Sequence, residues 1–340
     1  MTTDIKLLER LIRHQIFVQR FAGGQIKRAL PILRELARDL RRRIAEGNAT
    51  DFQMARMTAL EADLRFIAAD HASQVQQALD LEDFAVQEVQ FTQRLMGAAV
   101  AVDLAEGVTP ELVRALTTRR QMQLVSGQTV KRLTIPQMWD EFAEGVAKDA
   151  RRVVETGLIE GRTQQQMARG VAELVTTRSR RQAETVVRTA TNGIGSAARN
   201  MVYADNADIL EGERFIATLD SRTTRTCAGL DARDEVYPVG QGPTPPMHYG
   251  CRSVRVPVVK EQYRLGAKGE RASYQGPVSN QLTYQGFLKR QSAEFQDEVL
   301  GAKRAELFRS GKLKVGQFID DQGRVLSLDE LEARYGLTME

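Results

Sequence analysis

The chain has 340 residues, 42% hydrophobic and 27% charged, which is the composition of a folded globular protein and excludes wholesale disorder or a fibrous repeat. Its length exceeds the roughly 100–200 residues of a typical single domain, so two or three structural units are expected. The net charge is +4 but uneven, with +6 in residues 1–50, −5 in residues 51–100 and +5 in residues 151–200. Such patches fit phosphate backbones, acidic partners or simply solvated helix faces.

Neither a membrane span nor a secretory signal is expected. The most apolar stretch, residues 95–102, is far shorter than the roughly 20 residues that cross a bilayer. The first residues include Asp4 and Glu9 and lack an apolar region followed by a cleavage site. We therefore expect synthesis and assembly in the cytoplasm, with no membrane partner.

Residues 4–206 predict six or seven helices, because apolar residues recur at spacings of three and four. The first stripe comprises Leu7, Leu8, Leu11, Ile12, Ile16 and Phe17. A later stripe with Met138, Phe142 and Val146 contains Trp139, the only tryptophan, which favours a core position over a stacking platform.

Several helix starts and breaks can be predicted in this region. Thr50 with Gln53 and Thr163 with Gln166 have the spacing of capping boxes, and Thr109 precedes a proline and a glutamate. Helix breaks are expected at residues 23–24, at 47–48, around 107 and between 126 and 136.

The pattern changes after residue 212. Residues 213–220 predict a strand, and residues 253–259 predict another, which Pro257 pushes toward a sheet edge. Between them, residues 221–250 are rich in proline and glycine, which excludes a continuous helix. The tail predicts a helical run over residues 286–313, a small hairpin over 314–326 and a short helix capped by Ser327.

The fold class predicted from these elements is mainly α with a small α+β core. A long helical region precedes a short β-sheet with an irregular proline- and glycine-rich loop, and a small region of helix and hairpin follows. The expected domains are residues 1–130, a helical module that binds a partner, residues 131–260, which carry the motif described next, and residues 261–340, a C-terminal extension. Limited proteolysis should cut between the first two, near residues 125–136.

A series of residues at fixed spacings runs through positions 220–252. Its members are Asp220, Arg222, Thr223, Cys227, Leu230, Asp231, Pro245, Pro246, His248, Cys251 and Arg252. This series resembles the core motif of the phage Mu F-like head morphogenesis family of minor head proteins, D-x-R-T-(C/S)-x-x-C, then L-D-G, then P-P-x-H-x-x-C-R-(C/S). The chain departs from that pattern at Thr224, Ala232 and Ser253, where many members have cysteine, glycine and cysteine.

The resemblance covers roughly residues 140–310, including Arg188, Thr189 and Asn192 upstream of the motif. It implies a structural component of a bacteriophage particle and not an enzyme, assembled in the host cytoplasm and carried inside the capsid. The implied partner is the portal protein, with scaffold or major capsid protein as further candidates and non-specific contact with packaged DNA. A role in DNA packaging or ejection is also implied.

Two other classes of function compete with this reading. One is a general nucleic-acid-binding protein. The other is a domain joined to a toxin or transferase, for which the roughly 80 residues after the motif leave little room. Nucleotide-binding loops and zincin motifs are absent from the sequence, and a Cys227–His248 nucleophile and base has no protease context around it.

Cys227, His248 and Cys251 have three possible readings. They suit a structural zinc ion, for which Asp220 or Asp231 would supply the fourth ligand. The two cysteines, the only ones in the chain, could instead form a disulfide, or stay buried thiols beside a histidine that bonds to backbone.

The charged residues of the motif also have two readings. Asp220 and Thr223 suit a turn in which side chains bond to backbone amides, and Arg222 or Arg252 would pair with Asp220 or Asp231 as a clamp. Alternatively, Arg222, Arg225, Arg233 and Arg252 would contact phosphate. A further series upstream could line DNA or the portal, or form a solvated helix face: Arg162, Arg169, Arg178, Arg180, Arg181, Arg188 and Arg199.

Overall fold

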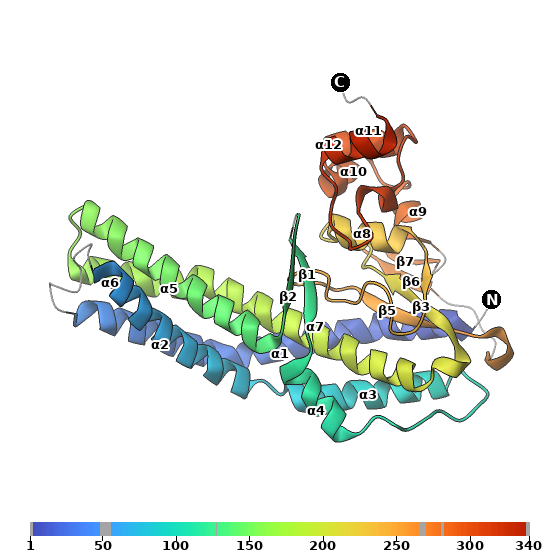
Figure 1. Cartoon of the computed structure of the whole chain (residues 1–340), viewed down its shortest axis with the longest axis horizontal. Helices are drawn as coiled ribbons and strands as arrows, with labels where there is room; N and C mark the ends of the chain where they lie inside the picture. Colours follow the sequence, from blue (N-terminus) through green and yellow to red (C-terminus); the bar gives the residue numbers. More distant parts are fainter. Residues whose placement is uncertain (1–2, 48–55, 127, 265–269, 280–281, 338–340) are drawn as a thin grey trace. The chain divides into compact units, whose positions relative to one another are not determined.

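The computed structural model describes residues 3–47, 56–126, 128–264, 270–279 and 282–337. It is mainly helical with small antiparallel sheets, as the sequence predicted (Figure 1). Of the described helices, none combines the length and the apolar character needed to cross a membrane. The chain divides into two compact units, each built from segments far apart in the sequence. The two units do not coincide with the consecutive segments 1–130, 131–260 and 261–340. The roles assigned to these segments from the sequence stay predictions.

One unit combines Gln19–Leu81 with Leu133–Thr191. Its described elements are the second part of α1 (Thr3–Ala45), α2 (Met57–Ala78), α5 (Ile135–Ile159), α6 (Gln164–Leu174), a π-helical turn (Val175–Ser179) and the first part of α7 (Arg180–Asp205). Helices α2 and α5 pack together, and Arg151 on α5 donates to Glu61 on α2 at 2.7 Å. Trp139 is buried and meets Phe142 edge to face, which confirms its core position.

The other unit combines Met1–Val18, Glu82–Arg132 and Asn192–Glu340. Besides the first part of α1 and the second part of α7, its described helices are α3 (Leu81–Gly97), α4 (Pro110–Arg119), α8 (Arg225–Ala232), α9 (Tyr284–Leu288), α10 (Ala293–Leu300), α11 (Ala302–Arg309) and α12 (Leu328–Tyr335). Its described strands are β1 (Met122–Ser126), β2 (Thr129–Leu133), β3 (Leu210–Ile216), β4 (Val236–Tyr237), β5 (Val254–Val259), β6 (Glu270–Ser273) and β7 (Gly276–Ser279). Short 3-10 helices occupy Ala207–Ile209, Glu261–Tyr263 and Val315–Phe318.

A three-stranded antiparallel sheet forms the centre of this second unit. Strand β3 lies between β4 and β5, with Phe215 opposite Arg255. The strand predicted at 213–220 therefore begins earlier and ends at Ile216, whereas β5 matches its prediction and lies at the sheet edge, where Pro257 is tolerated. Glu213 and Arg255 are fully buried in this sheet and form an ion pair at 3.1 Å.

Seven α-helices lie within the described part of residues 3–206, as predicted, and their caps agree where they can be compared. Thr109 caps α4, and Thr163 with Gln166 forms the capping box of α6. The box predicted at Thr50 and Gln53 lies outside the described residues.

Some predicted boundaries are wrong. Helix α1 runs unbroken through Gly23 and Gly24, because its buried stripe continues through Val18, Ala22 and Ile26. In its first part, Leu7, Leu8 and Leu11 are buried as expected, but Ile16 and Phe17 are about half exposed. The helix break expected between residues 126 and 136 is confirmed, but the paired strands β1 and β2, which lie between α4 and α5, were not predicted.

The C-terminal region also differs in detail from its prediction. The helical run over 286–313 is three short helices, since Gly301 at φ 79° separates α10 from α11. The hairpin at 314–326 is a 3-10 helix followed by one bridge, Ile319 to Val325. The last helix has the predicted capping box of Ser327 and Glu330.

Candidate functional site

The first part of the motif places Cys227 at the start of α8. Thr224 is the N-cap of this helix, and its hydroxyl accepts a hydrogen bond from the backbone N–H of Cys227 at 3.4 Å. Residues 221–250 were expected to be irregular throughout because of their prolines and glycines, so helix α8 is a correction. The cap fixes the first turn of the helix, and the Cys227 side chain is buried there, 1% exposed.

The second part of the motif is a turn from His248 to Cys251. The Cys251 N–H donates to the His248 carbonyl at 3.2 Å, and the Val125 N–H of β1 donates to the Met247 carbonyl at 2.6 Å. From α7, the Asn192 amide donates to the Cys251 carbonyl at 3.0 Å and accepts from Gln15 at 2.8 Å. Helix α7 and strand β1 therefore fix the position of this turn.

These two parts bring Cys227, His248 and Cys251 together, as predicted. One potential ligand atom from each lies within 4.8 Å of the others, and the two sulfur atoms are 3.7 Å apart. Both cysteines are free thiols, since a disulfide would require about 2.05 Å. The His248 Nδ1 lies 2.9 Å from the Tyr249 carbonyl, which can only accept, so Nδ1 carries a proton, and in the neutral imidazole Nε2 keeps its lone pair.

The three groups influence one another electrostatically. Burial, together with the neighbouring Cys251, raises the pKa of the Cys227 thiol well above its ordinary value. Burial alone would also raise the pKa of Cys251, but hydrogen bonds from Cys227 and His248 hold it well below its ordinary value. Burial disfavours the charged imidazole, yet contact with Cys251 raises the pKa of His248. Since both sulfur atoms are almost completely buried, a bulky substrate cannot reach them, which weighs against a nucleophile and base.

Asp220 is not part of this cluster, because it pairs with Arg252. The guanidinium donates to both carboxylate oxygens, at 2.6 and 2.7 Å, and the Thr223 hydroxyl adds a third hydrogen bond at 3.2 Å. This confirms the predicted clamp. Arg222 contributes little to it, since its nearest nitrogen is 3.6 Å away and its side chain is 79% exposed.

Asp231 is equally occupied. Its two oxygens accept from the backbone N–H groups of Ala217 at 2.6 Å and Tyr284 at 2.7 Å, so it joins the end of β3 to the start of α9. The Tyr284 hydroxyl also donates to the Asp220 carbonyl at 3.0 Å. Tyr284 was missed in the sequence, where only its place after Thr283, an N-cap residue, marks it. Neither predicted fourth ligand, Asp220 or Asp231, is therefore among the residues whose ligand atoms come together.

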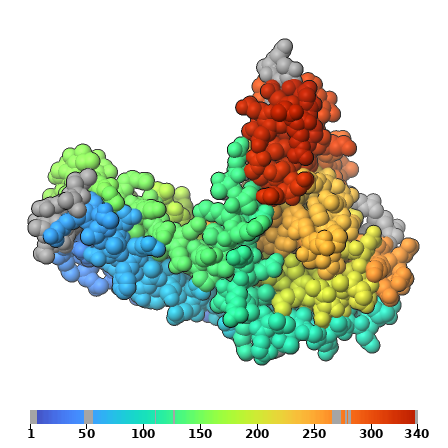
Figure 2. Space-filling view, in the orientation of Figure 1, coloured from blue at the N-terminus to red at the C-terminus, as the bar shows by residue number. Residues whose placement is uncertain are grey.

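The other motif arginines hold the C-terminal region. Arg225 donates to the Val299 carbonyl at 3.2 Å, and Arg233 donates to the carbonyls of Ile319 and Asp320 at 3.2 and 3.0 Å. In the space-filling view of Figure 2 the residues coloured red accordingly lie against those coloured orange. Of the four arginines considered for phosphate contact, three thus bind protein groups and only Arg222 is exposed.

The upstream arginine series also contains both arginines that bind protein groups and arginines that are exposed. Arg199 is buried and donates to Glu88 at 2.6 Å, and the second oxygen of Glu88 contacts His14. Arg199 can therefore not line DNA. Arg188, which is half-buried, donates to Gln19. The remaining members are exposed: Arg162, Arg169, Arg178, Arg180 and Arg181.

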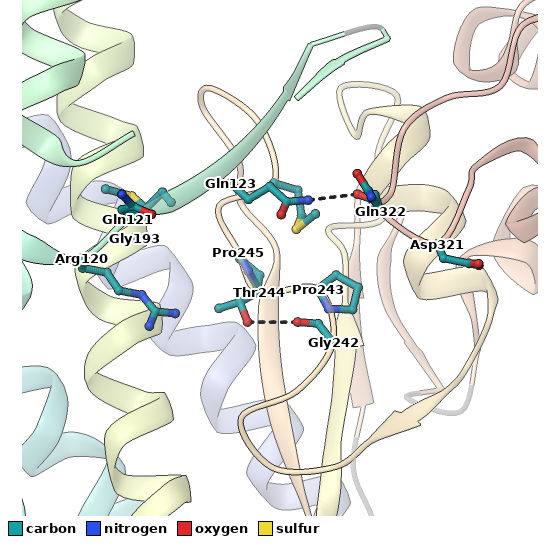
Figure 3. A pocket seen from close by; sticks show the side chains of 12 residues that line it. Arg120, Gln121, Gln123, Gly193, Gly242, Pro243, Thr244, Pro245, Asp321 and Gln322 are labelled. Atoms are coloured by element: carbon teal, nitrogen blue, oxygen red, sulfur yellow. Dashed lines mark hydrogen bonds between the residues drawn. The ribbon is translucent and has the colours of Figure 1, made fainter. Parts of the chain in front are cut away.

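A polar cavity of about 290 Å³ lies beside the motif loop. Figure 3 shows that Arg120 and Gln123 reach it from the segment of β1, Pro243 and Pro245 from the loop, and Asp321 from the C-terminal region. The Gln123 side chain donates to the Gln322 carbonyl at 3.3 Å across one edge. Strand β1, the loop and the tail are thus tied together at this cavity.

Comparison with known proteins relates the motif region to one family. Residues 148–256 match the family model described as Phage Mu protein F like protein, and this range includes the whole motif and helix α7. Neither the curated proteins nor the solved structures contain a match to the chain. The match relates this region of the chain to phage head morphogenesis proteins. Residues 148–256 are therefore a Phage Mu F-like region, and the resemblance predicted from the motif is confirmed for these residues.

Proposed function

We propose that the protein is a minor head protein that acts in prohead assembly, associated with the portal vertex and carried inside the capsid. The observation that carries this proposal is the family match over residues 148–256. The motif residues support it, because most of them bind other parts of the protein and stabilise a scaffold. Such a role requires binding surfaces and no catalysis, and we propose that the protein is not an enzyme.

The helical unit of residues 19–81 and 133–191 offers a surface for the portal protein. Two large apolar side chains are exposed on it, Phe66 at 78% and Ile159 at 81%. The same unit presents exposed cations along α1: Lys27, Arg28, Arg34, Arg38 and Arg41. Exposed apolar groups among charges are typical of surfaces that bind other proteins. Scaffold and major capsid protein are alternative partners for this surface.

Co-purification tests the partner. A tagged full-length chain, expressed with the portal protein, should retain it in a high-salt wash. Phe66→Asp combined with Ile159→Asp should abolish this retention without lowering the melting temperature, because both side chains are exposed. Leu112→Asp, an equally drastic change at an exposed position of α4 in the other unit, is the matched control. Retention unchanged in the double variant would contradict the proposed surface.

Contact with packaged DNA is the second part of the proposal, and the exposed arginines of the series from Arg162 to Arg181 support it. Such contact should be non-specific and should weaken steeply as salt rises, since it depends on counterion release. If salt-sensitive DNA binding is the only interaction found, and no head protein is retained, the alternative of a general nucleic-acid-binding protein is favoured.

A further inference from the structure

The buried cluster of Cys227, His248 and Cys251 has the donor atoms and the arrangement of a metal site. We propose that these three residues bind one zinc ion, through the two thiolates and Nε2 of His248, with water as the fourth ligand. The zinc site is independent of the partner and of any role in the phage particle. It joins the first turn of α8 to the turn from His248 to Cys251, which are 24 residues apart in the sequence.

The distances fit tetrahedral coordination. Two sulfur atoms, each about 2.3 Å from a tetrahedral zinc ion, lie about 3.8 Å apart. The observed separation is 3.7 Å, and the histidine nitrogen lies within 4.8 Å of both sulfur atoms. A zinc ion therefore fits between the three groups with only small movements of the side chains.

The groups around the cluster are those that support zinc ligands. A histidine that binds metal through one nitrogen usually donates its other N–H to a carbonyl or carboxylate, and His248 donates from Nδ1 to the Tyr249 carbonyl. The Thr224 hydroxyl lies beside Cys227 and accepts a hydrogen bond from its backbone N–H at 3.4 Å. The proton of this hydroxyl is therefore available to a coordinated thiolate.

The charge balance also favours zinc. Two thiolates and a neutral imidazole carry a charge of −2, which a divalent ion neutralises, and a neutral cluster is far less costly to bury than separate charges. The nearby carboxylates would add negative charge, but Asp220 is neutralised by Arg252 and Asp231 is held by two backbone amides. The fourth position is therefore left to water, beside Thr224, whose hydroxyl lies 3.4 Å from the Cys227 backbone nitrogen.

Metal analysis of the full-length chain tests the proposal. The protein is purified without a histidine tag under reducing conditions, incubated with zinc and desalted. One zinc ion per chain is expected, and cobalt(II) in its place should give the visible absorption of a tetrahedral site with thiolate ligands. Cys251→Ser should lose both, whereas His71→Gln, which removes a buried histidine outside the cluster, should keep both. Wild-type protein without stoichiometric zinc and without the cobalt spectrum would overturn the proposal.

A gain of affinity provides a test that does not depend on a damaged variant. Thr224→Cys replaces one hydroxyl beside Cys227 with a thiol of similar size and creates a Cys-x-x-Cys pair, a common zinc-ligand spacing. Its thiolate should displace the water and raise zinc affinity, by more than the roughly tenfold effect of a single outer-shell partner. Ser310→Cys, which adds a thiol remote from the cluster in sequence and outside the site, is the control and should leave affinity unchanged. Equal affinity in Thr224→Cys and wild type would show that the fourth position does not face residue 224 and would overturn the proposed geometry.

Discussion

The charged residues of the motif act mainly on one another and on the backbone. Arg252 and Asp220 form two hydrogen bonds in a planar, bidentate arrangement, the strongest type of ion pair in proteins. Asp231 satisfies two backbone N–H groups from separate elements. The side chains of Asp220 and Arg252 are both largely buried. Removing one partner of this pair therefore leaves the other desolvated and without its ion pair. Their chemical role is to hold the loop between β3 and β5.

The Asp220–Arg252 pair predicts a clear effect on stability. Asp220→Asn removes the charge while keeping the size, and should lower the free energy of unfolding at neutral pH by roughly 1–3 kcal/mol. Arg222→Gln removes an exposed charge 3.6 Å from the same carboxylate and should cost less than about 0.5 kcal/mol. Urea denaturation of the two variants measures both. Equal losses would show that Arg252 is not the dominant partner.

The same pair predicts a pH dependence. Burial raises the pKa of Asp220, but the hydrogen bonds from Arg252 outweigh it and hold the pKa below its ordinary value of 3.8. A carboxylate with a lowered pKa stabilises the fold above its unfolded pKa, and this contribution is lost as the pH falls through the folded pKa. The stability difference between wild type and Asp220→Asn should therefore be largest near neutral pH and shrink below 3.8. A difference that grows on acidification would contradict the assignment.

Helix ends and helix contacts account for much of the architecture at the next scale. Gln164 at the start of α6 donates to the carbonyls of Ile44, Ala45 and Gly47, and so satisfies carbonyl groups at the end of α1 that have no helical partner. Within α7, Gly193 packs directly against Met122 of β1. The position of a strand on a helix thus depends on the absence of a side chain at one residue.

Two glycine substitutions in helices should have opposite effects. Gly193→Ala would place a methyl group inside the Met122 side chain and should destabilise the protein by roughly 1–3 kcal/mol. Gly24→Ala on α1 meets nothing within 4 Å and should stabilise it by about 0.5–1 kcal/mol, because alanine favours the helix. Thermal or urea unfolding compares them. The loss from Gly193→Ala should be smaller in a Met122→Ala background; an undiminished loss would locate the clash elsewhere.

The sequence was sufficient for elements with strong local signals. Capping boxes at Thr163 and Ser327 and the alternation of β5 predicted element ends to within a few residues, since these signals depend on neighbouring residues alone. The helix break predicted at Gly23 and Gly24 was wrong, because the buried apolar stripe on either side of these glycines outweighs their low helix propensity. Helix α8 was missed because proline and glycine dominate the rest of that loop.

The candidate site could be predicted only in part for the same reason. Spacing and residue type were enough to group Cys227, His248 and Cys251. They could not reveal which of the two arginines pairs with Asp220, that backbone N–H groups occupy Asp231, or that Tyr284 contacts both, since these contacts join residues up to 64 positions apart. The buried pair of Glu213 and Arg255 had a weak signal, a charge at an inward position of an apolar strand.

The whole molecule is built from two compact units with interleaved segments, and this bears on whether residues 1–130 can fold alone. In a fragment of these residues, Glu88 would lose Arg199, Gln15 would lose Asn192 and Glu61 would lose Arg151. We therefore expect the fragment to melt without a cooperative transition and to be digested rapidly, whereas the full chain melts cooperatively. A cooperative, protease-resistant fragment would instead support the separable module expected from the sequence.

Mass spectrometry of purified proheads and mature virions tests whether the protein is a component of the phage head, as we propose. Peptides of this chain are expected in proheads and in virions, at a few copies per particle relative to the major capsid protein and comparable in amount to the portal protein. Absence of the chain from both particles, in preparations where the portal protein is readily detected, would contradict this proposal.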